Sequence, residues 1–189
     1  PVIHFYETFL AKYDARLRKA RGVWYTPQPV VNFIVRAVDD ILKTKFNIKD
    51  GLADNSKTTI QREAQGTAIT KGKNKGQKLT EEVEVHKVQI LDPATGTGTF
   101  LAEVVNFLYQ NKFQHMQGVW PSYVEKDLIP RLNGFELLMA SYAMAHLKLD
   151  MLFGETGCDM RNQANRLRVF LTNSLEEYHP DTHTLFSSW

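Results

Sequence analysis

The sequence predicts an α/β fold, organised around a doubly wound and mainly parallel β-sheet, with a helical segment at the N-terminus. The main observation is alternation, because short β-prone runs ending at Leu91, Phe135 and Leu171 are separated by stretches of helical periodicity. The first run also passes directly into a glycine-containing turn and then a helix. Ligands of such sheets bind beyond the carboxyl ends of the strands, so we expect the functional residues in the loops that follow these three runs.

Composition sets outer limits on the kind of protein. The 189 residues are 43% hydrophobic and 23% charged, which is ordinary for a globular protein with a sizeable core. The net charge of +2 does not by itself indicate a nucleic-acid-binding module. The single cysteine, Cys158, allows no internal disulfide and fits a cytoplasmic protein. No apolar run is long enough for a membrane span, and no pair of Cys or His residues has the spacing of a zinc site, so we expect neither membrane nor metal.

The N-terminal region, residues 1–49, predicts two helices joined by an ordered loop. In residues 2–19, aromatic and aliphatic side chains recur every four residues, as in an amphipathic helix. Residues 22–29 then contain one glycine and two prolines, which break the helix. Thr26 is suited to cap a second helix, with Pro27 at its first position, and that helix is expected to run to about Lys43. Its predicted apolar stripe consists of Val30, Ile34, Val38 and Ile41.

Residues 50–82 differ in character from the segments on either side. They contain few large apolar residues and include four closely spaced lysines, Lys71, Lys73, Lys75 and Lys78. We therefore expect a flexible basic insertion, either a long excursion or a loose hairpin. Such a loop could contact DNA phosphates, although composition alone favours a solvated insertion.

The α/β core is expected to occupy residues 83–189. Residues 85–91 predict a strand, and residues 99–115 predict a helix with an apolar face. A further helix is expected over 121–131, followed by a short strand into Glu136 and a helix over 137–151. The apolar face of the 99–115 helix consists of Phe100, Leu101, Val104, Val105 and Leu108.

The segment from Ile90 to Leu101 carries the strongest chemical signal. Gly96 and Gly98 allow a sharp turn and close approach of a ligand, and the following helix N-terminus favours an anionic group. A phosphate-binding P-loop would need a lysine after the second glycine, but Thr99 stands there. A dinucleotide fingerprint would need a third glycine, but Leu101 stands there.

Residues 92–100, with the sequence DPATGTGTF, resemble the cofactor-binding motif of N6-adenine DNA methyltransferases. Residues 22–31 look like the segment that precedes this motif, and residues 134–138 look like the acidic motif of the same enzymes. Together with residues 171–176, the order is similar to that of single-chain restriction-modification enzymes that fuse nuclease, helicase and methyltransferase. The resemblance covers nearly all of the chain except the insertion.

The resemblance implies S-adenosylmethionine as the cofactor and assigns a role to each matching residue. Asp92 would act near the methionine end, where Thr26 and Pro27 would close over the cofactor. Glu136 would accept hydrogen bonds from the two ribose hydroxyls. Asn173 stands where the family often has an acid that contacts the adenine amine. The implied cofactor-binding residues are Thr26, Pro27, Asp92, Pro93, Ala94, Gly96, Gly98, Phe100, Glu136 and Asn173.

Purely structural roles are open for the same residues. Thr26 and Pro27 could form only a helix cap, and Asp92 could only shape the turn before Pro93. Glu136 could be a surface residue, and Asn173 a turn residue.

The family's catalytic motif is Asn/Asp-Pro-Pro-Tyr/Phe, but all seven prolines of this sequence are isolated. We therefore expect no catalytic residue in the chain, which would be a truncated core that does not methylate DNA alone. DNA and the helicase and nuclease segments of a longer polypeptide would be its partners. A methyltransferase for RNA or protein, and a non-enzymatic coupling module, are the alternatives.

Overall fold

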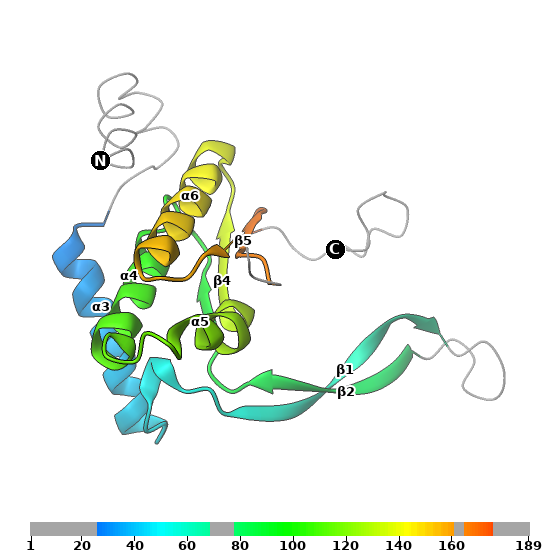
Figure 1. Ribbon diagram of the computed structural model, residues 1–189. Coiled ribbons are helices and arrows are strands. Elements are labelled where there is room, and N and C mark those ends of the chain that lie inside the picture. Colours follow the sequence, from blue (N-terminus) through cyan, green and yellow to red (C-terminus); the bar gives the residue numbers. More distant parts are fainter. Residues whose placement is uncertain (1–25, 69–77, 161–164, 176–189) are drawn as a thin grey trace.

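The computed structural model describes residues 26–68, 78–160 and 165–175. Their central feature is a three-stranded parallel sheet in the order β3-β4-β5 (Figure 1). The strands span Ile90–Asp92, Leu132–Glu136 and Arg168–Leu171. Asp92 pairs with Gly134, and Glu136 pairs with Leu171, so all three strands end at the same edge of the sheet. The predicted α/β class and the strands ending near Phe135 and Leu171 are therefore confirmed.

Three long helices lie on one side of this sheet (Figure 1). They are α3 (Gln28–Lys45), α4 (Thr99–Leu108) and α6 (Met139–Glu155). Helix α4 lies between the other two and contacts both of them. The connections β3–α4–β4 and β4–α6–β5 advance in one direction across the sheet, as right-handed crossovers do when their helices share one face.

Between α4 and β4 the chain is helical but irregular. It passes through a π-helical stretch at Tyr109–Phe113, the short helix α5 (Trp120–Tyr123), a second π-helical stretch at Val124–Leu128 and a 3-10 turn at Ile129–Arg131. Trp120 is fully buried, stacks on Tyr123, packs against the tilted ring of Phe113, and donates its indole N–H to Thr156 Oγ1 at 3.0 Å. An aromatic cluster therefore holds this connection to the end of α6.

The predicted insertion forms an antiparallel hairpin that projects away from the body (Figure 1). Its strands are β1 (Lys57–Ala68) and β2 (Lys78–His86). The boundaries therefore differ from 50–82, because residues 51–53 form a buried 3-10 turn of the body and β2 continues to His86. For the same reason the strand predicted over 85–91 is divided, since its first two residues belong to β2 and its last two belong to β3. The lysines at 71, 73 and 75 and the helix predicted over 2–19 lie outside the described residues.

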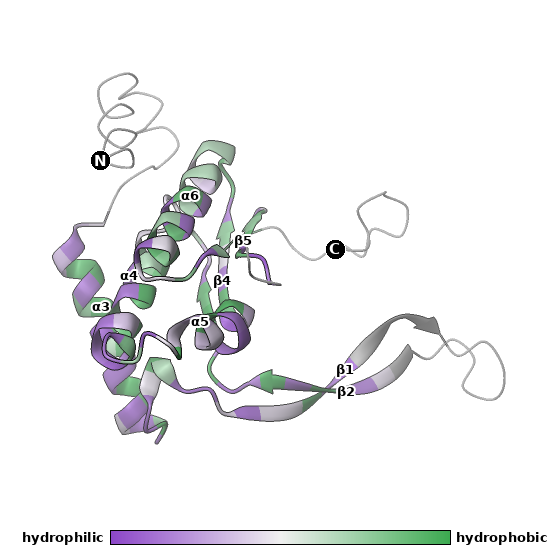
Figure 2. Ribbon diagram, in the orientation of Figure 1, coloured by the Kyte–Doolittle hydropathy of each residue, from purple (hydrophilic) through white to green (hydrophobic). Residues whose placement is uncertain are grey.

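Helix α3 begins and ends close to its predicted limits, but it buries a different face. Its buried apolar residues are Val31 and Val35, whereas Ile34 and Val38 of the predicted stripe are 38% and 42% exposed. In α4, by contrast, the predicted apolar residues Leu101, Val104, Val105 and Leu108 are the buried ones. Hydropathy along the ribbon shows the contrast, because α3 alternates between hydrophilic and hydrophobic turns while α6 is mostly hydrophobic (Figure 2).

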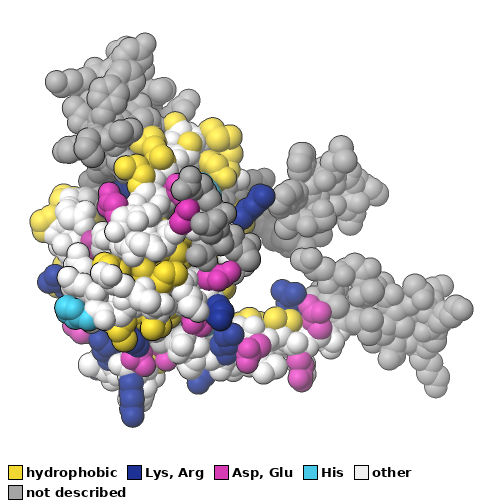
Figure 3. Space-filling view, viewed as in Figure 1, with side chains coloured by type: hydrophobic (Ala, Val, Ile, Leu, Met, Phe, Trp, Pro, Cys, Tyr) yellow, Lys and Arg dark blue, Asp and Glu magenta, His cyan; other side chains and the backbone are white. Residues whose placement is uncertain are grey.

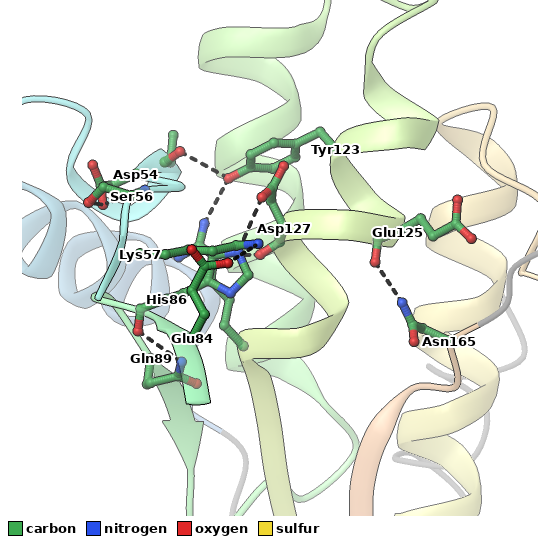
Figure 4. Close-up of polar contacts among 12 residues, drawn as sticks. Asp54, Ser56, Lys57, Glu84, His86, Gln89, Tyr123, Glu125, Asp127 and Asn165 are labelled. Atoms are coloured by element: carbon green, nitrogen blue, oxygen red, sulfur yellow. Dashed lines mark hydrogen bonds and ion pairs between the residues drawn. The ribbon is translucent and has the colours of Figure 1, made fainter. Parts of the chain in front are cut away.

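Polar contacts anchor the hairpin to the body (Figure 4). His86 Nε2 lies 3.1 Å from Asp127 Oδ1, and the Tyr123 hydroxyl donates to Ala53 O at 3.1 Å. The fully buried Arg131 donates through Nη2 to Leu52 O and to the Tyr123 hydroxyl, both at 2.7 Å. Nothing in the sequence pattern predicted this cluster. In the part of the chain that the structure describes, no helix is long and apolar enough to cross a membrane.

Candidate functional site

The turn after β3 is shaped by its two glycines, which have different surroundings. Both have a positive φ, +56° at Gly96 and +80° at Gly98, which is strained for any residue with a side chain. A Cβ atom on Gly98 would lie 3.3 Å from the Cα and Cβ atoms of Ala145, so this glycine also allows α4 to pack closely on α6. A Cβ atom on Gly96 would meet nothing within 4 Å. Gly96 is therefore the position where a ligand can approach the backbone.

The buried Thr95 connects this turn to the end of β4 by a hydrogen bond. Thr95 is buried, with 4% of its surface exposed, and its backbone N–H donates to Phe135 O at 3.0 Å. The Thr95 hydroxyl donates to Asp92 O at 3.0 Å, which closes the turn on itself. The turn is thus held in place by its own polar groups and by the neighbouring strand.

Glu136 reaches from the end of β4 to the same turn. Its Oε2 accepts the Gly96 N–H at 2.7 Å, and its Oε1 accepts the Leu138 N–H at 2.8 Å. The side chain is buried, which excludes the alternative of a surface carboxylate. Each carboxylate oxygen can accept more than one hydrogen bond, so both contacts leave acceptor capacity on this group.

Asp92 ends β3 and lies close enough to Glu136 for their charges to interact. Burial raises the pKa of the Asp92 carboxyl, the Ala94 N–H bond opposes this, and the negative charge of Glu136 raises it further. Its Oδ1 accepts the Ala94 N–H at 3.2 Å, as the turn-shaping alternative requires. Its Oδ2 is buried and has no hydrogen-bond partner among the described residues. The two predicted carboxylates are therefore brought together, and Asp92 has one oxygen without a hydrogen-bond partner among the described residues.

The helix-terminus anion site expected from the sequence is already occupied in part by the protein itself. The Gly96 N–H donates to Glu136, and the Gly98 N–H donates to Thr95 O at 2.9 Å. An anionic ligand that bound these two N–H groups would have to displace their present acceptors. An uncharged or cationic group beside Asp92 would meet no such competition.

Thr26 and Pro27 precede α3, but the cap differs from the predicted one. Pro27 itself is the N-cap, its carbonyl accepts the N–H groups of Val30 and Val31, and no side chain caps the helix. The Gln28 side chain donates to Glu103 at 2.9 Å, which ties this end of α3 to α4. Thr26 is left half-buried, without the capping role.

Asn173 follows β5 and is exposed. Its Oδ1 accepts the Leu175 N–H at 3.1 Å, which is the contact of a turn-forming asparagine. The preceding Thr172 N–H donates to Glu136 O at 2.9 Å, so the loop after β5 lies against the end of β4. The structure therefore gives Asn173 its turn role while keeping it near the acidic residue.

A groove of about 400 Å³ lies beside this site. Ile34, Val38 and Leu42 of α3 form one wall, residues 89–93 form a second, and Phe100, Leu101 and Val104 of α4 complete it. Of the predicted residues, Asp92, Pro93 and Phe100 line the groove. Among residues 26–68, 78–160 and 165–175, no cluster of His, Cys, Asp and Glu side chains could hold a metal ion.

The folded turn, its two clustered carboxylates and the parallel strands define an α/β domain with a candidate ligand site at the carboxyl ends of its strands. Comparison with known proteins makes this class more specific. Residues 2–68 match the family model described as N-6 DNA Methylase. The resemblance predicted from the motifs is thereby confirmed for the N-terminal part, although the matched segment ends before the turn at residues 92–100. No curated protein sequence matches the chain.

Solved structures show a similar fold. The structure described as a DrdV–DNA complex is 24% identical, with a TM-score of 0.55, over 91% of this chain and 12% of that one. A nuclease-deletion mutant of the Type ISP restriction-modification enzyme LlaGI, in complex with a DNA substrate mimic, is 23% identical, with a TM-score of 0.52, over 88% of this chain and 12% of that one. The ATP-dependent Type ISP restriction-modification enzyme LlaBIII, bound to DNA, is 24% identical, with a TM-score of 0.51, over 80% of this chain and 8% of that one. The chain thus has the fold of a small part of these much longer proteins.

Proposed function

We propose that this chain is the S-adenosylmethionine-binding part of a DNA N6-adenine methyltransferase in a restriction-modification system. The single observation that carries the proposal is the pairing of Asp92 and Glu136 on adjacent strand ends, where the buried Asp92 Oδ2 has no hydrogen-bond partner among the described residues. The carboxyl ends of parallel strands are where α/β sheets bind ligands. The N-6 DNA Methylase match and the folds of the restriction-modification enzymes support this choice of class.

The residues present fit the proposed cofactor. A carboxylate oxygen without a donor suits the ammonium group of a methionine tail, directly or through water. Glu136 retains acceptor capacity for hydroxyl donors such as those of a ribose. When bound, S-adenosylmethionine supplies an electrophilic methyl group, and the contribution of these residues is to position it.

The fold class is part of the same proposal. We infer that β3, β4 and β5 are one half of a doubly wound sheet, because parallel sheets are normally covered on both faces and this one carries its long helices on a single face. The 189 residues contain no Pro-Pro pair, so we propose that they bind cofactor without transferring a methyl group to DNA alone.

Calorimetric titration of the chain with S-adenosylmethionine tests the proposal. We expect measurable binding, weakened roughly 10- to 100-fold by Asp92→Asn, since a hydrogen bond to a charged group contributes about 1.5–3 kcal/mol. Asp150→Asn is the matched control, because it neutralises an exposed carboxylate on α6. No heat at millimolar cofactor, or equal affinity in both variants, would contradict the cofactor assignment.

The reaction itself needs the polypeptide to which the chain would belong. We expect that protein to methylate adenine in duplex DNA and to lose this activity with Asp92→Asn. Methylation of RNA or protein by it would favour the alternative substrates. Cofactor-independent docking to another protein would favour a coupling module.

A further inference from the structure

Helix α3 begins without the usual support of a helix N-terminus. No side chain caps it, and its first turn contains no acidic residue. The N–H groups of Val30 and Val31 both bond to the Pro27 carbonyl, at 2.9 and 3.2 Å. Because the start of a helix carries a partial positive charge, a nearby carboxylate stabilises it. For α3 such a carboxylate has to come from a neighbouring element.

Glu103 of α4 supplies this negative charge from across the helix pair. Gln28 Nε2, on the first residue of α3, donates to Glu103 Oε2 at 2.9 Å. With its nitrogen oriented toward α4, the Asn32 side-chain amide donates to both Glu103 oxygens at 3.2 Å. The charge of Arg36 acts on the same carboxylate. The three α3 residues are spaced by four, so they form one polar row that faces Glu103.

The surroundings of Glu103 act on its carboxyl group in two opposing ways. Burial raises the pKa of this group from its usual 4.5, whereas the charge of Arg36 and the hydrogen bond from Gln28 oppose the rise. Glu103 is half-buried and stands between Ala102 and Val104, which belong to the buried face of α4. A carboxylate adds little to apolar packing, so the contribution of Glu103 to the fold is its contact with α3.

Glu103 also lies close to the candidate site. It is four residues, or about 6 Å, into α4, whose first residue follows the glycine turn. The far ends of the two helices are adjacent as well, since Lys112 Nζ beyond α4 lies 2.7 Å from Asp50 Oδ1 beyond α3. The helices therefore run in the same direction, and both begin at the carboxyl ends of the strands. Residues 26–27 precede α3 on that side.

We propose that Glu103 is a positioning residue for the cofactor site, because it holds the first turn of α3 and thereby fixes Thr26 and Pro27 beside the carboxyl ends of the strands. Neither of these two residues caps α3 with its side chain. Gln28 makes the connection, since it follows Pro27 directly and bonds to Glu103. The inference rests on the proposed function, which supplies the ligand over which residues 26–27 close.

Hydrogen exchange of the free chain tests the positioning step. We expect Glu103→Ala to accelerate exchange of the Val30 and Val31 amides several-fold, because the first turn of α3 loses its partner on α4. Exchange of the Leu52 amide, which is hydrogen-bonded toward the far end of α3, should not change. Asp40→Ala removes an exposed carboxylate from α3 and is the matched control. Unchanged exchange at Val30 and Val31 would overturn the proposal.

Calorimetric titration with S-adenosylmethionine tests the consequence for the site. We expect Glu103→Ala and Gln28→Ala to weaken binding roughly 3- to 10-fold, as the loss of one ordinary hydrogen bond does. The melting temperature of the free chain should stay unchanged, because exposed polar contacts contribute little to overall stability. The double variant Gln28→Glu with Glu103→Gln exchanges carboxylate and amide between the helices and should restore most of the affinity. Asp40→Ala should bind as the wild type does.

The outcomes separate this inference from the proposed function. Equal affinity of Glu103→Ala and the wild type would overturn the inference alone. So would a loss of affinity that the exchanged pair does not restore, or one that a matching fall in melting temperature accompanies. Absence of binding by the wild type itself would contradict the proposed function, and this inference with it.

Discussion

Two buried polar atoms lack a partner among the described residues, and they lie in contrasting places. Asp92 Oδ2 lies at the carboxyl ends of the strands, on a residue that lines an open groove. Arg131 Nη1 lies at the root of the hairpin, on a side chain with no exposed surface. Asp92 is partly exposed, so a ligand can contact this residue without unfolding the protein, whereas nothing from solvent reaches Arg131. An unsatisfied polar group therefore indicates a binding site only where the structure also provides access.

The largest effect on stability is expected at the fully buried Arg131. Arg131→Met removes the donors to Leu52 O, Asp127 O and the Tyr123 hydroxyl. Because unsatisfied buried acceptors cost about 1–3 kcal/mol each, we expect a loss of about 2–5 kcal/mol in the free energy of unfolding, measured by urea denaturation. Arg131→Lys keeps the charge and part of the bonding, so its loss should be smaller. If Arg131→Met left the free energy of unfolding unchanged, the hydrogen bonds of this cluster would contribute little to stability, and the burial of Arg131 would not distinguish it from Asp92.

The two glycines of the turn are expected to differ in their effect on stability. Gly98→Ala forces a side chain into a positive φ and against Ala145, and we expect it to cost about 2–3 kcal/mol. Gly96→Ala meets only the backbone strain, so a loss of about 1 kcal/mol is expected. Thermal and urea unfolding of both variants give the order. If Gly96→Ala were the more destabilising change, Gly96 would not face open space as a ligand-binding position should.

Asp92→Asn tests, through pH, the carboxyl group that lines the groove. Burial raises the pKa of Asp92 above its usual 3.8, so the folded protein binds this proton more tightly than the unfolded chain does. The contribution of Asp92 to stability is therefore greatest below the unfolded pKa and is lost as the pH rises through the folded pKa. We expect the stability of the wild type, relative to Asp92→Asn, to fall from about pH 3.5 upward, measured by urea unfolding at each pH. A flat difference would mean that Asp92 is as well solvated in the folded protein as in the unfolded chain.

Much of the fold around the candidate site could be predicted from local sequence. The turn, the strand into Glu136 and the apolar face of α4 follow from glycine spacing and periodicity, which are properties of neighbouring residues. The contact of Glu136 with the Gly96 N–H could not be predicted, because the two residues lie 40 positions apart along the chain. The burial of Asp39 is a similar case, since its carboxylate accepts the Leu52 N–H at 2.8 Å on a helix face that periodicity alone assigns to solvent.

The hairpin shows why composition misleads at longer range. A stretch poor in large apolar residues predicts no core, so residues 50–82 predict a long flexible excursion or a loose hairpin. The described strands form a hairpin, and they satisfy their backbones by pairing with each other, which requires no core. They also carry charges of both signs, as the space-filling view shows (Figure 3). The basic character predicted for this region is thus not a property of its described part, where Lys57 faces Glu84 and Arg62 faces Glu81.

The smallest effect is expected in this exposed part of the hairpin. Arg62 Nε donates to Glu81 Oε1 at 2.8 Å, but both side chains are about half exposed, and exposed ion pairs contribute about 0–1 kcal/mol. We expect Arg62→Ala to change the free energy of unfolding by less than about 0.5 kcal/mol, and the reversed pair Arg62→Glu with Glu81→Arg to match the wild type. His86→Gln, at the sealed root of the same hairpin, should cost more, because His86 and Asp127 are largely removed from water. Urea denaturation of the three variants measures how the contribution of polar contacts to stability falls from the root of the hairpin to its exposed part. An equal loss of stability in all three would show that burial does not determine that contribution.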